Sequence, residues 1–294
     1  MRRLSFSESL LTIYSKDVAF LIHHKDLNRS FFSDVKAARK RFRPYSTEKT
    51  VPTAWGDIVP AQVLLLEEGL QKYPDAVSFT FVSGECIPVA PIKDCRATVK
   101  LGSIMSHDIV PWSDLVRQQI GNPKDYACYG HTWISLSRQH ARAAVETPTE
   151  YYQMKARPLP GMTHSLVPDE YAIRTHVLNE YQTTLRNLLT EKKRSKKNRK
   201  KLRYPRGAKG QKQYPNAFYT ALTAHTGIRN NTITNFVQMV TNNKPQQHPI
   251  TYKTVGTQLI KELRRSKKEG YLMFRKIKVN PVTVAELKRH NFFL

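Results

Sequence analysis

One carboxylate in this sequence stands where it could act as a base. Glu170 follows Pro168 and Asp169, at the start of a stretch in which apolar residues recur every three or four positions. Proline is tolerated in the first turn of a helix, so we expect a helix to begin here. The unpaired amides and the dipole of a helix start favour a carboxylate that stays ionised. Such a carboxylate can act as a general base, although acidic residues at helix starts also serve only to stabilise the helix.

Two lysines near the C-terminus offer the complementary chemistry. Lys253 and Lys276 each follow an apolar segment that could fix their position, although both could be ordinary surface lysines. The sequence contains no GxxxxGK[ST] loop, no GxGxxG motif and no DxD triplet. A diphosphate bound by this chain would therefore be neutralised by basic side chains and not by a P-loop or a DxD-bound metal.

Other candidate groups are less specific. His23 and His24 end the first apolar run, where they could touch a ligand or form the polar edge of a strand. No serine lies in a GxSxG elbow, so nucleophilic hydrolysis is not indicated. The three cysteines show neither a CxxC pair nor a zinc-type Cys/His spacing. We therefore expect no disulfide framework, no metal cofactor and a reducing compartment.

The charge of the chain predicts an anionic partner or substrate. The 48 Lys and Arg residues exceed the 23 Asp and Glu residues, which gives a net charge of +25. Twelve of these cations fall between Lys192 and Lys212, a run that we expect to form a solvated, mobile loop. The run could bind nucleic acid through phosphates, with Tyr204 and Tyr214 stacking on bases, or it could be a localisation signal or an insertion.

The elements that must position these residues follow an α/β pattern. We predict strands at 18–22, 77–82, 130–138 and 271–274, helices at 31–42, 58–70, 112–120, 170–188 and 255–263, a turn at 83–88 and a loop at 150–167. Alternating strands and helices predict a parallel or mixed sheet covered by helices. Ligands bind outside the carboxyl ends of strands in such sheets, so the segments after Ile22, Val82 and Leu136 are candidates.

The chain is expected to form one domain over residues 1–294, with residues 191–213 as a basic, mobile insertion. It has no apolar run of the roughly twenty residues that a membrane span needs and no secretory signal pattern. These features favour a soluble, cytoplasmic protein.

Four blocks of sequence, in order along the chain, resemble one family. They are Ala54–Ala61 (AWGDIVPA), Phe79–Pro88 (FTFVSGECIP), Gly130–Ala141 (GHTWISLSRQHA) and Pro168–Tyr171 (PDEY). Together they are similar to the core-2/I-branching glycosyltransferases, a family that includes the peptide O-xylosyltransferases and a large plant branch. The resemblance covers residues 18–190 well and 245–280 loosely.

The resemblance implies a GT-A-like fold and an inverting, metal-independent transfer from a UDP-sugar. The sugar would be N-acetylglucosamine or xylose, and the acceptor a hydroxyl of a glycan, a protein or a small molecule. The family's catalytic carboxylate falls on Glu170, with Asp169 and Trp133 as structural neighbours.

The resemblance also assigns the donor site. The cations that hold the family's diphosphate fall on Lys253 and Lys276, with Arg275 as a neighbouring option. The residues expected near the nucleoside or in the cleft are His23, His24, Trp55 and Glu85. Two alternatives stay open: a nucleic-acid-binding protein acting through residues 192–212, and an inactive relative that binds a glycan or a partner.

Overall fold

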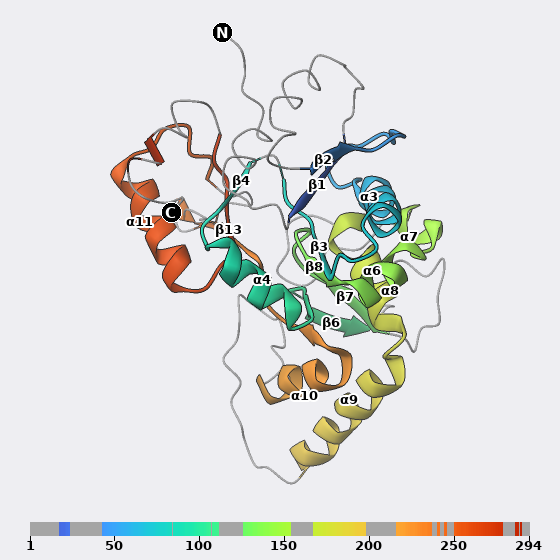
Figure 1. The fold of residues 1–294 in the computed structure, drawn as a ribbon. Coiled ribbons are helices and arrows are strands. Elements are labelled where there is room, and N and C mark those ends of the chain that lie inside the picture. The colour runs from blue at the N-terminus through green and yellow to red at the C-terminus, as the bar shows by residue number, and fades with distance from the viewer. Residues whose placement is uncertain are drawn as a thin grey trace. The chain divides into compact units, whose positions relative to one another are not determined.

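The structure is a computed structural model that describes residues 18–23, 43–83, 85–106, 108–111, 126–153, 167–197, 216–236, 240–241, 244–245, 250–278, 286–287 and 289. The chain divides into two compact units (Figure 1). Unit 1 consists of Met1–Thr50, Phe81–Lys100 and Thr232–Leu294, and unit 2 of Val51–Thr80 and Leu101–Asn231. The expectation of one domain over residues 1–294 stays a prediction.

Unit 2 combines a small mixed sheet with helices. Its elements are α3 (Val59–Lys72), β3 (Ser78–Thr80), β5 (Ser103–Ile104), β6 (Asp108–Pro111), β7 (Tyr126–Tyr129), β8 (Ser135–Ser137), α6 (Arg138–Val145), α7 (Thr149–Gln153), the 3-10 turn η1 (Pro168–Glu170), α8 (Ala172–Asn179), α9 (Gln182–Lys197), α10 (Asn216–Thr226) and β9 (Ile228–Arg229).

The sheet of unit 2 has the strand order β3-β8-β5-β9. β8 is antiparallel to both β3 and β5, whereas β5 and β9 are parallel. The predicted α/β class and mixed sheet are therefore confirmed. β3 and β8 are antiparallel, so their carboxyl ends point in opposite directions and the candidate segments that follow them do not share one edge of this sheet.

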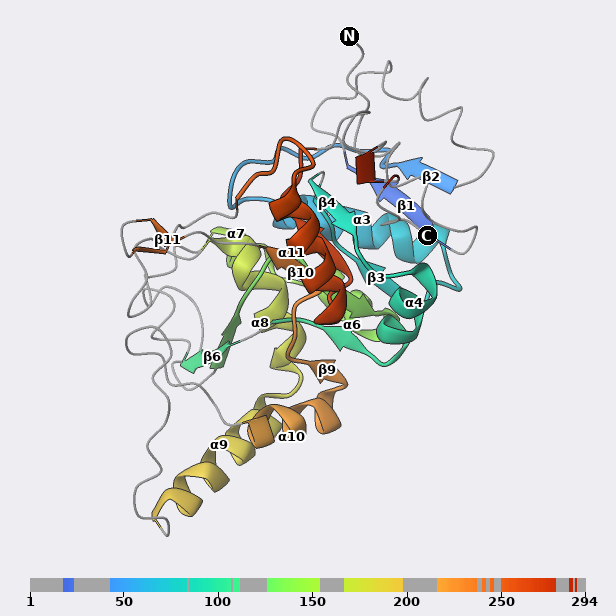
Figure 2. The ribbon, with the colours of Figure 1, turned by 90° about the vertical axis from the view of Figure 1, so that its left-hand side faces the viewer.

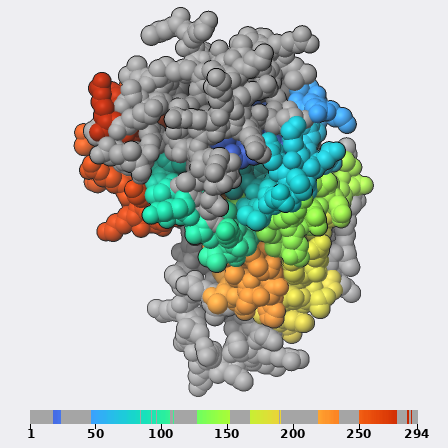
Figure 3. Space-filling model, viewed as in Figure 1, coloured from blue at the N-terminus to red at the C-terminus, as the bar shows by residue number. Residues whose placement is uncertain are grey.

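Helices of unit 2 pack against one another and against a two-stranded ribbon that is separate from the sheet. α3 packs on α6, α6 on α8, and α8 on β7, which pairs with β6 in an antiparallel ribbon. α9 and α10 lie side by side in both ribbon views and on the surface (Figures 1, 2 and 3). Leu185 of α9 and Leu222 of α10 form an apolar cluster with Ile109 of β6.

The long helix predicted from Glu170 to Leu188 is divided in the structure. Glu170 ends the 3-10 turn η1, and α8 ends at Asn179 before α9 begins at Gln182. The apolar periodicity is correct, because Ile173, Val177 and Leu185 are all buried. Polar contacts accompany the break between the helices. The Asn179 side chain donates to the Tyr151 hydroxyl and accepts a hydrogen bond from the side-chain amide of Gln182.

Two further predictions are corrected. The strand predicted at 130–138 is limited to Ser135–Ser137, because the Gly130 amide donates to the Glu170 carbonyl and not to a neighbouring strand. The loop predicted from Lys192 is wrong for residues 192–197, which continue α9. Lys and Arg are good helix formers, so a helix already begun extends through them. Residues 198–212 lie outside the described residues.

Unit 1 contains a three-stranded sheet, two small ribbons and two helices among its described residues. Its elements are β1 (Ala19–Ile22), β2 (Arg43–Ser46), β4 (Cys86–Pro88), α4 (Ile92–Lys100), β10 (Thr234–Phe236), β11 (Val240–Thr241), β12 (Lys244–Pro245), α11 (Thr257–Lys268) and β13 (Met273–Arg275).

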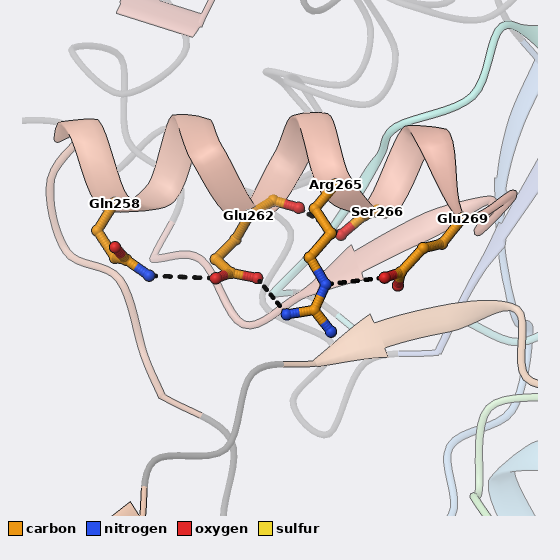
Figure 4. Close-up of polar contacts among 5 residues, drawn as sticks. All are labelled: Gln258, Glu262, Arg265, Ser266 and Glu269. Atoms are coloured by element: carbon orange, nitrogen blue, oxygen red, sulfur yellow. Dashed lines mark hydrogen bonds and ion pairs between the residues drawn. The ribbon is translucent and has the colours of Figure 1, made fainter.

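The core of unit 1 lies between α11 and the sheet β10-β13-β4. β13 is parallel to β10 and antiparallel to β4, and β4 tolerates Pro88 because it is an edge strand. Leu259, Ile260 and Leu263 of α11 pack with Ile87 and Phe274 of the sheet. On the polar side of α11, Arg265 contacts Glu262 and Glu269 (Figure 4). The helix and strand predicted near the C-terminus are thereby confirmed.

Short elements replace several expected turns and loops. β4 follows the turn in which the Cys86 amide donates to the Ser83 carbonyl, so only the first half of the predicted turn at 83–88 is correct. α7 occupies the start of the predicted 150–167 loop. The helices predicted at 31–42 and 112–120 lie outside the described residues.

Candidate functional site

The centre of the candidate site in unit 2 is the turn that carries Glu170. The Glu170 amide donates to the Val167 carbonyl at 2.9 Å, and the Tyr171 amide donates to the Pro168 carbonyl at 3.1 Å. Pro168 fits at the start of this 3-10 turn because its missing amide has no partner to lose. Asp169 and Glu170 are half-buried, and Tyr171 behind them is fully buried. The backbone at Glu170 is thus fixed on both sides.

The segment from Gly130 to Trp133 holds this turn from outside. The Gly130 amide donates to the Glu170 carbonyl at 2.9 Å, and the Thr132 hydroxyl donates to Oδ2 of Asp169, also at 2.9 Å. Gly130 is required by close packing, since a Cβ atom there would lie 2.0 Å from the Ser106 carbonyl oxygen. The half-buried Trp133 lies on the same segment, and its role as a structural neighbour of Glu170 stays a prediction.

The turn that contains Trp55 packs against Val167, at the start of the Glu170 turn. Ala54 and Asp57 form an antiparallel bridge around Gly56, whose φ of 76° suits glycine. A Cβ at Gly56 would lie 2.6 Å from Cγ1 of Val167, the residue before Pro168. The indole of Trp55 is 72% exposed, so it is available to a ligand. Three blocks of the sequence resemblance therefore meet at one turn.

A buried arginine completes the site, and the sequence reading missed it. Arg174 is 1% exposed, and it donates from Nε to the Ser106 carbonyl at 3.2 Å and from Nη1 to the Asp169 carbonyl at 3.1 Å. Burial lowers its pKa to about 10, and negative charge at Cys128, Asp169 and Glu170, in that order, opposes the shift. Its spacing of four residues from Glu170 would place both on one face of the continuous helix expected from the sequence, but that spacing does not predict its burial.

The environment of Asp169 distinguishes it from an ordinary surface carboxylate. Burial raises its pKa, and the hydrogen bond from Thr132 and the charge of Arg174 oppose that rise. The charge of Asp57 adds to it. Asp169 therefore acts as the anchored member of the acidic pair, with its carboxylate held by Thr132.

In unit 1 the structure brings together the predicted diphosphate residues and Glu85. Nζ of Lys276 lies 2.8 Å from Oε2 of Glu85, and both side chains are partly exposed. The Ile277 amide donates to the Glu85 carbonyl, and the Tyr252 amide donates to the Lys276 carbonyl. Because Tyr252 is bonded to Lys276, these bonds also bring the exposed Lys253 close to the segment that follows β13.

Arg275 precedes Lys276 at the end of β13. It pairs with Cys86 in the β4–β13 register, and its side chain is half-buried. Burial raises the pKa of the Cys86 thiol, although the Arg275 charge opposes the rise, so this thiol is a poor nucleophile. Unit 1 thus brings the backbones of three cationic residues close together, and one of them, Lys276, pairs with Glu85.

The predicted histidines add little to either group. His23 follows β1 and is half-buried, whereas His24 lies outside the described residues.

His140, from the Gly130–Ala141 block, has a structural role. Its Nδ1 lies 2.7 Å from Oγ of Ser103 and 3.1 Å from Oγ of Ser137, and its Nε2 lies 3.1 Å from the Tyr181 hydroxyl. Ser103 and His140 are 0% and 3% exposed, so this Ser–His pair cannot reach a substrate. Burial also lowers the His140 pKa, which keeps the ring neutral. The network joins α6 to β5 and to Tyr181, which lies between α8 and α9.

Among the residues that the structure describes, no group of three or more His, Cys, Asp or Glu side chains could hold a metal ion. In the described part of the chain, no helix has the length and apolar character needed to cross a membrane. A scan of protein-family models and a search of curated proteins find no match to this chain.

Proposed function

We propose that the chain is an inverting, metal-independent glycosyltransferase of the core-2/I-branching type, with a GT-A-like fold. It transfers N-acetylglucosamine or xylose from a UDP-sugar to an acceptor hydroxyl. The observation that supports this most is the meeting of the Trp55, Gly130 and Pro168 blocks around the Glu170 turn, since these segments are far apart in sequence. A turn fixed by so many backbone bonds holds a catalytic carboxylate in one geometry.

In this proposal Glu170 acts as the general base. Its carboxylate removes the proton from the acceptor hydroxyl while the oxygen attacks the anomeric carbon opposite UDP. The bond to the diphosphate breaks as the new bond forms, so the product is a β-linked sugar. Asp169 fixes the turn through its contact with Thr132 and does not exchange the proton.

The cations of unit 1 supply the second task, which is to stabilise the leaving diphosphate. Lys276, Arg275 and Lys253 carry positive charge that the diphosphate would neutralise in place of a metal ion. Oε2 of Glu85 lies 2.8 Å from Nζ of Lys276 and neutralises its charge. A diphosphate must therefore compete with Glu85 for this ammonium group.

Donor binding provides the first test. Replacing Lys276 by glutamine is expected to weaken UDP binding by about 10-fold to 100-fold, because one charge-assisted hydrogen bond contributes roughly 1.5–3 kcal/mol. Isothermal titration calorimetry with UDP in EDTA measures the effect. The matched control is Lys93→Gln, which removes an exposed lysine from α4 of the same unit and should bind like wild type. Failure of the wild-type chain to bind UDP in EDTA would contradict the proposal.

A second candidate function, binding of nucleic acid, is favoured by the exposed face of α11. Lys261, Arg264 and Lys268 are exposed at i, i+3 and i+7, so they form one stripe opposite the buried Leu259 and Leu263. They have no ion pair with any described residue, whereas Arg265 is engaged by Glu262 and Glu269 (Figure 4). The stripe extends about 10 Å along the helix, a length comparable to about three phosphates of a DNA strand.

If this stripe binds phosphates, changing all three cations to glutamine should reduce the salt dependence of binding. For a single-stranded oligonucleotide, the slope of log K against log salt should fall in magnitude by about 2, at about 0.7 per lost contact. Fluorescence anisotropy at several salt concentrations measures it. The control changes the exposed Lys72, Lys93 and Lys100 to glutamine, which removes equal charge elsewhere. Equal slopes for both triple variants would exclude a specific role for α11.

A further inference from the structure

We infer that Arg174 is a positioning residue that holds the Asp169–Glu170 turn and keeps the Glu170 carboxylate ionised, so that it sets the lower pH limit of the reaction. The inference rests on the proposed function for its catalytic consequence. Its electrostatic part concerns the charge of Glu170 alone and can be tested separately.

The burial of Arg174 is costly for a purely structural residue. Transfer of a guanidinium from water to a protein interior carries a large desolvation penalty unless charges compensate for it. Arg174 is among the largest fully buried side chains, yet its hydrogen bonds go to two neutral carbonyl groups. Its Nη2 has no hydrogen-bond partner within the described part of the chain. A well-packed apolar side chain would fill this position at lower cost.

The position of Arg174 in the helix adds a second cost. It lies in the first turn of α8, where the positive end of the helix dipole disfavours a cation. Side chains of helices point toward the N-terminus, so the guanidinium is directed back to the turn at Asp169 and Glu170. The two negative charges that act on Arg174 from this turn are those of Asp169 and Glu170. These carboxylates offset part of both costs, although the effect of burial on the Arg174 pKa still prevails, and the cation in return favours their ionised forms.

Other charged groups near the turn do not replace this cation. Titratable residues on the surrounding described segments are Asp57, Tyr126, Cys128, Tyr129, His131, Glu150, Tyr151, Tyr152, Tyr171 and His176. Most of them are acidic or neutral at pH 7. His131 is exposed, and burial lowers the pKa of His176, which favours its neutral form. Arg174 is the buried cation that contacts this turn directly, through its bond to the Asp169 carbonyl.

Two substitutions separate the charge of Arg174 from its hydrogen bonds. Arg174→Gln keeps a donor but removes the charge, whereas Arg174→Lys keeps the charge and loses the planar fork. The neighbouring carboxylates favour the protonated form of a lysine at this position. In Arg174→Gln, the acid limb of the pH profile of kcat/KM should move up by about one pH unit. In Arg174→Lys, the limb should stay near the wild-type position while kcat falls.

A direct titration of Glu170 tests the inference without any assay of activity. Protein labelled with carbon-13 at the glutamate side-chain carboxyl is titrated by NMR, and the Glu170 signal is identified by its loss in Glu170→Gln. The midpoint should rise by about one pH unit in Arg174→Gln and stay near wild type in Arg174→Lys. Equal midpoints in wild type and Arg174→Gln would overturn the inference. If the wild-type chain transfers no sugar, the proposed function fails, and this comparison still decides the role of Arg174.

The inference can still be tested if the Arg174→Gln variant does not fold. The double variant Arg174→Gln/Glu170→Gln then replaces it, and folding is followed by circular dichroism. Recovery of folding supports the inference, because the loss of Arg174 is then harmful through its effect on the charged Glu170 carboxylate. A double variant that is equally unfolded would show that Arg174 serves only as a structural anchor, and would overturn the inference.

Discussion

Replacing Glu170 by glutamine is expected to lower the turnover number by about 10²-fold to 10⁴-fold, which is the usual contribution of a general base. Glutamine has nearly the same shape as glutamate but cannot accept the proton from the acceptor hydroxyl. The bonds that fix residue 170 are made by its backbone amide and carbonyl, so the turn should persist. Affinity for UDP should change by no more than about twofold, because the carboxylate acts on the acceptor.

The measurement is release of UDP from UDP-N-acetylglucosamine or UDP-xylose with candidate acceptors, in EDTA. The matched control is Glu180→Gln, which changes an exposed glutamate just after α8 and should leave turnover unchanged. Undiminished turnover in Glu170→Gln would eliminate Glu170 as the base. A wild-type chain that binds UDP or a glycan but never turns over would instead identify an inactive relative that acts by binding.

Elements with a strong local signal could be predicted from the sequence. α3 has a proline in its first turn and a broad apolar side. α11 buries Leu259, Ile260 and Leu263, which recur at helical spacing. Such patterns depend only on neighbours in the chain. The helix after Glu170 was predicted as one element because the apolar period continues across its break. The break coincides with contacts to the distant Tyr151 and His140, which no local pattern contains.

The candidate site shows the same limit. Glu170 could be identified because proline and two acidic residues mark a helix start. Arg174 could not, since a charged residue is ordinarily assigned to the exposed face of a helix. The pairing of Glu85 with Lys276 depends on the antiparallel register of β4 and β13, which are far apart in sequence. Residues that act through tertiary contacts thus cannot be identified from local sequence patterns and require the structure.

The second large effect is expected for Gly130→Ala. This substitution should reduce the free energy of unfolding by at least about 3 kcal/mol, because overpacking against a fixed backbone cannot be relieved by a side-chain rotation. The new Cβ would lie 2.0 Å from the Ser106 carbonyl oxygen, which is also the acceptor for Nε of Arg174. Movement of either backbone would also disturb the bond from the Gly130 amide to the Glu170 carbonyl.

A second glycine of unit 2 separates this steric effect from backbone strain. Gly227 has a φ of 67°, and a Cβ there would meet nothing within 4 Å. Gly227→Ala should therefore cost only about 1–2 kcal/mol, the penalty of a left-handed conformation. Urea unfolding followed by circular dichroism compares the two variants with wild type. If Gly130→Ala is no less stable than Gly227→Ala, the Gly130 segment can move away from Ser106, and the turn that holds Glu170 is not the rigid support on which its role as a base depends.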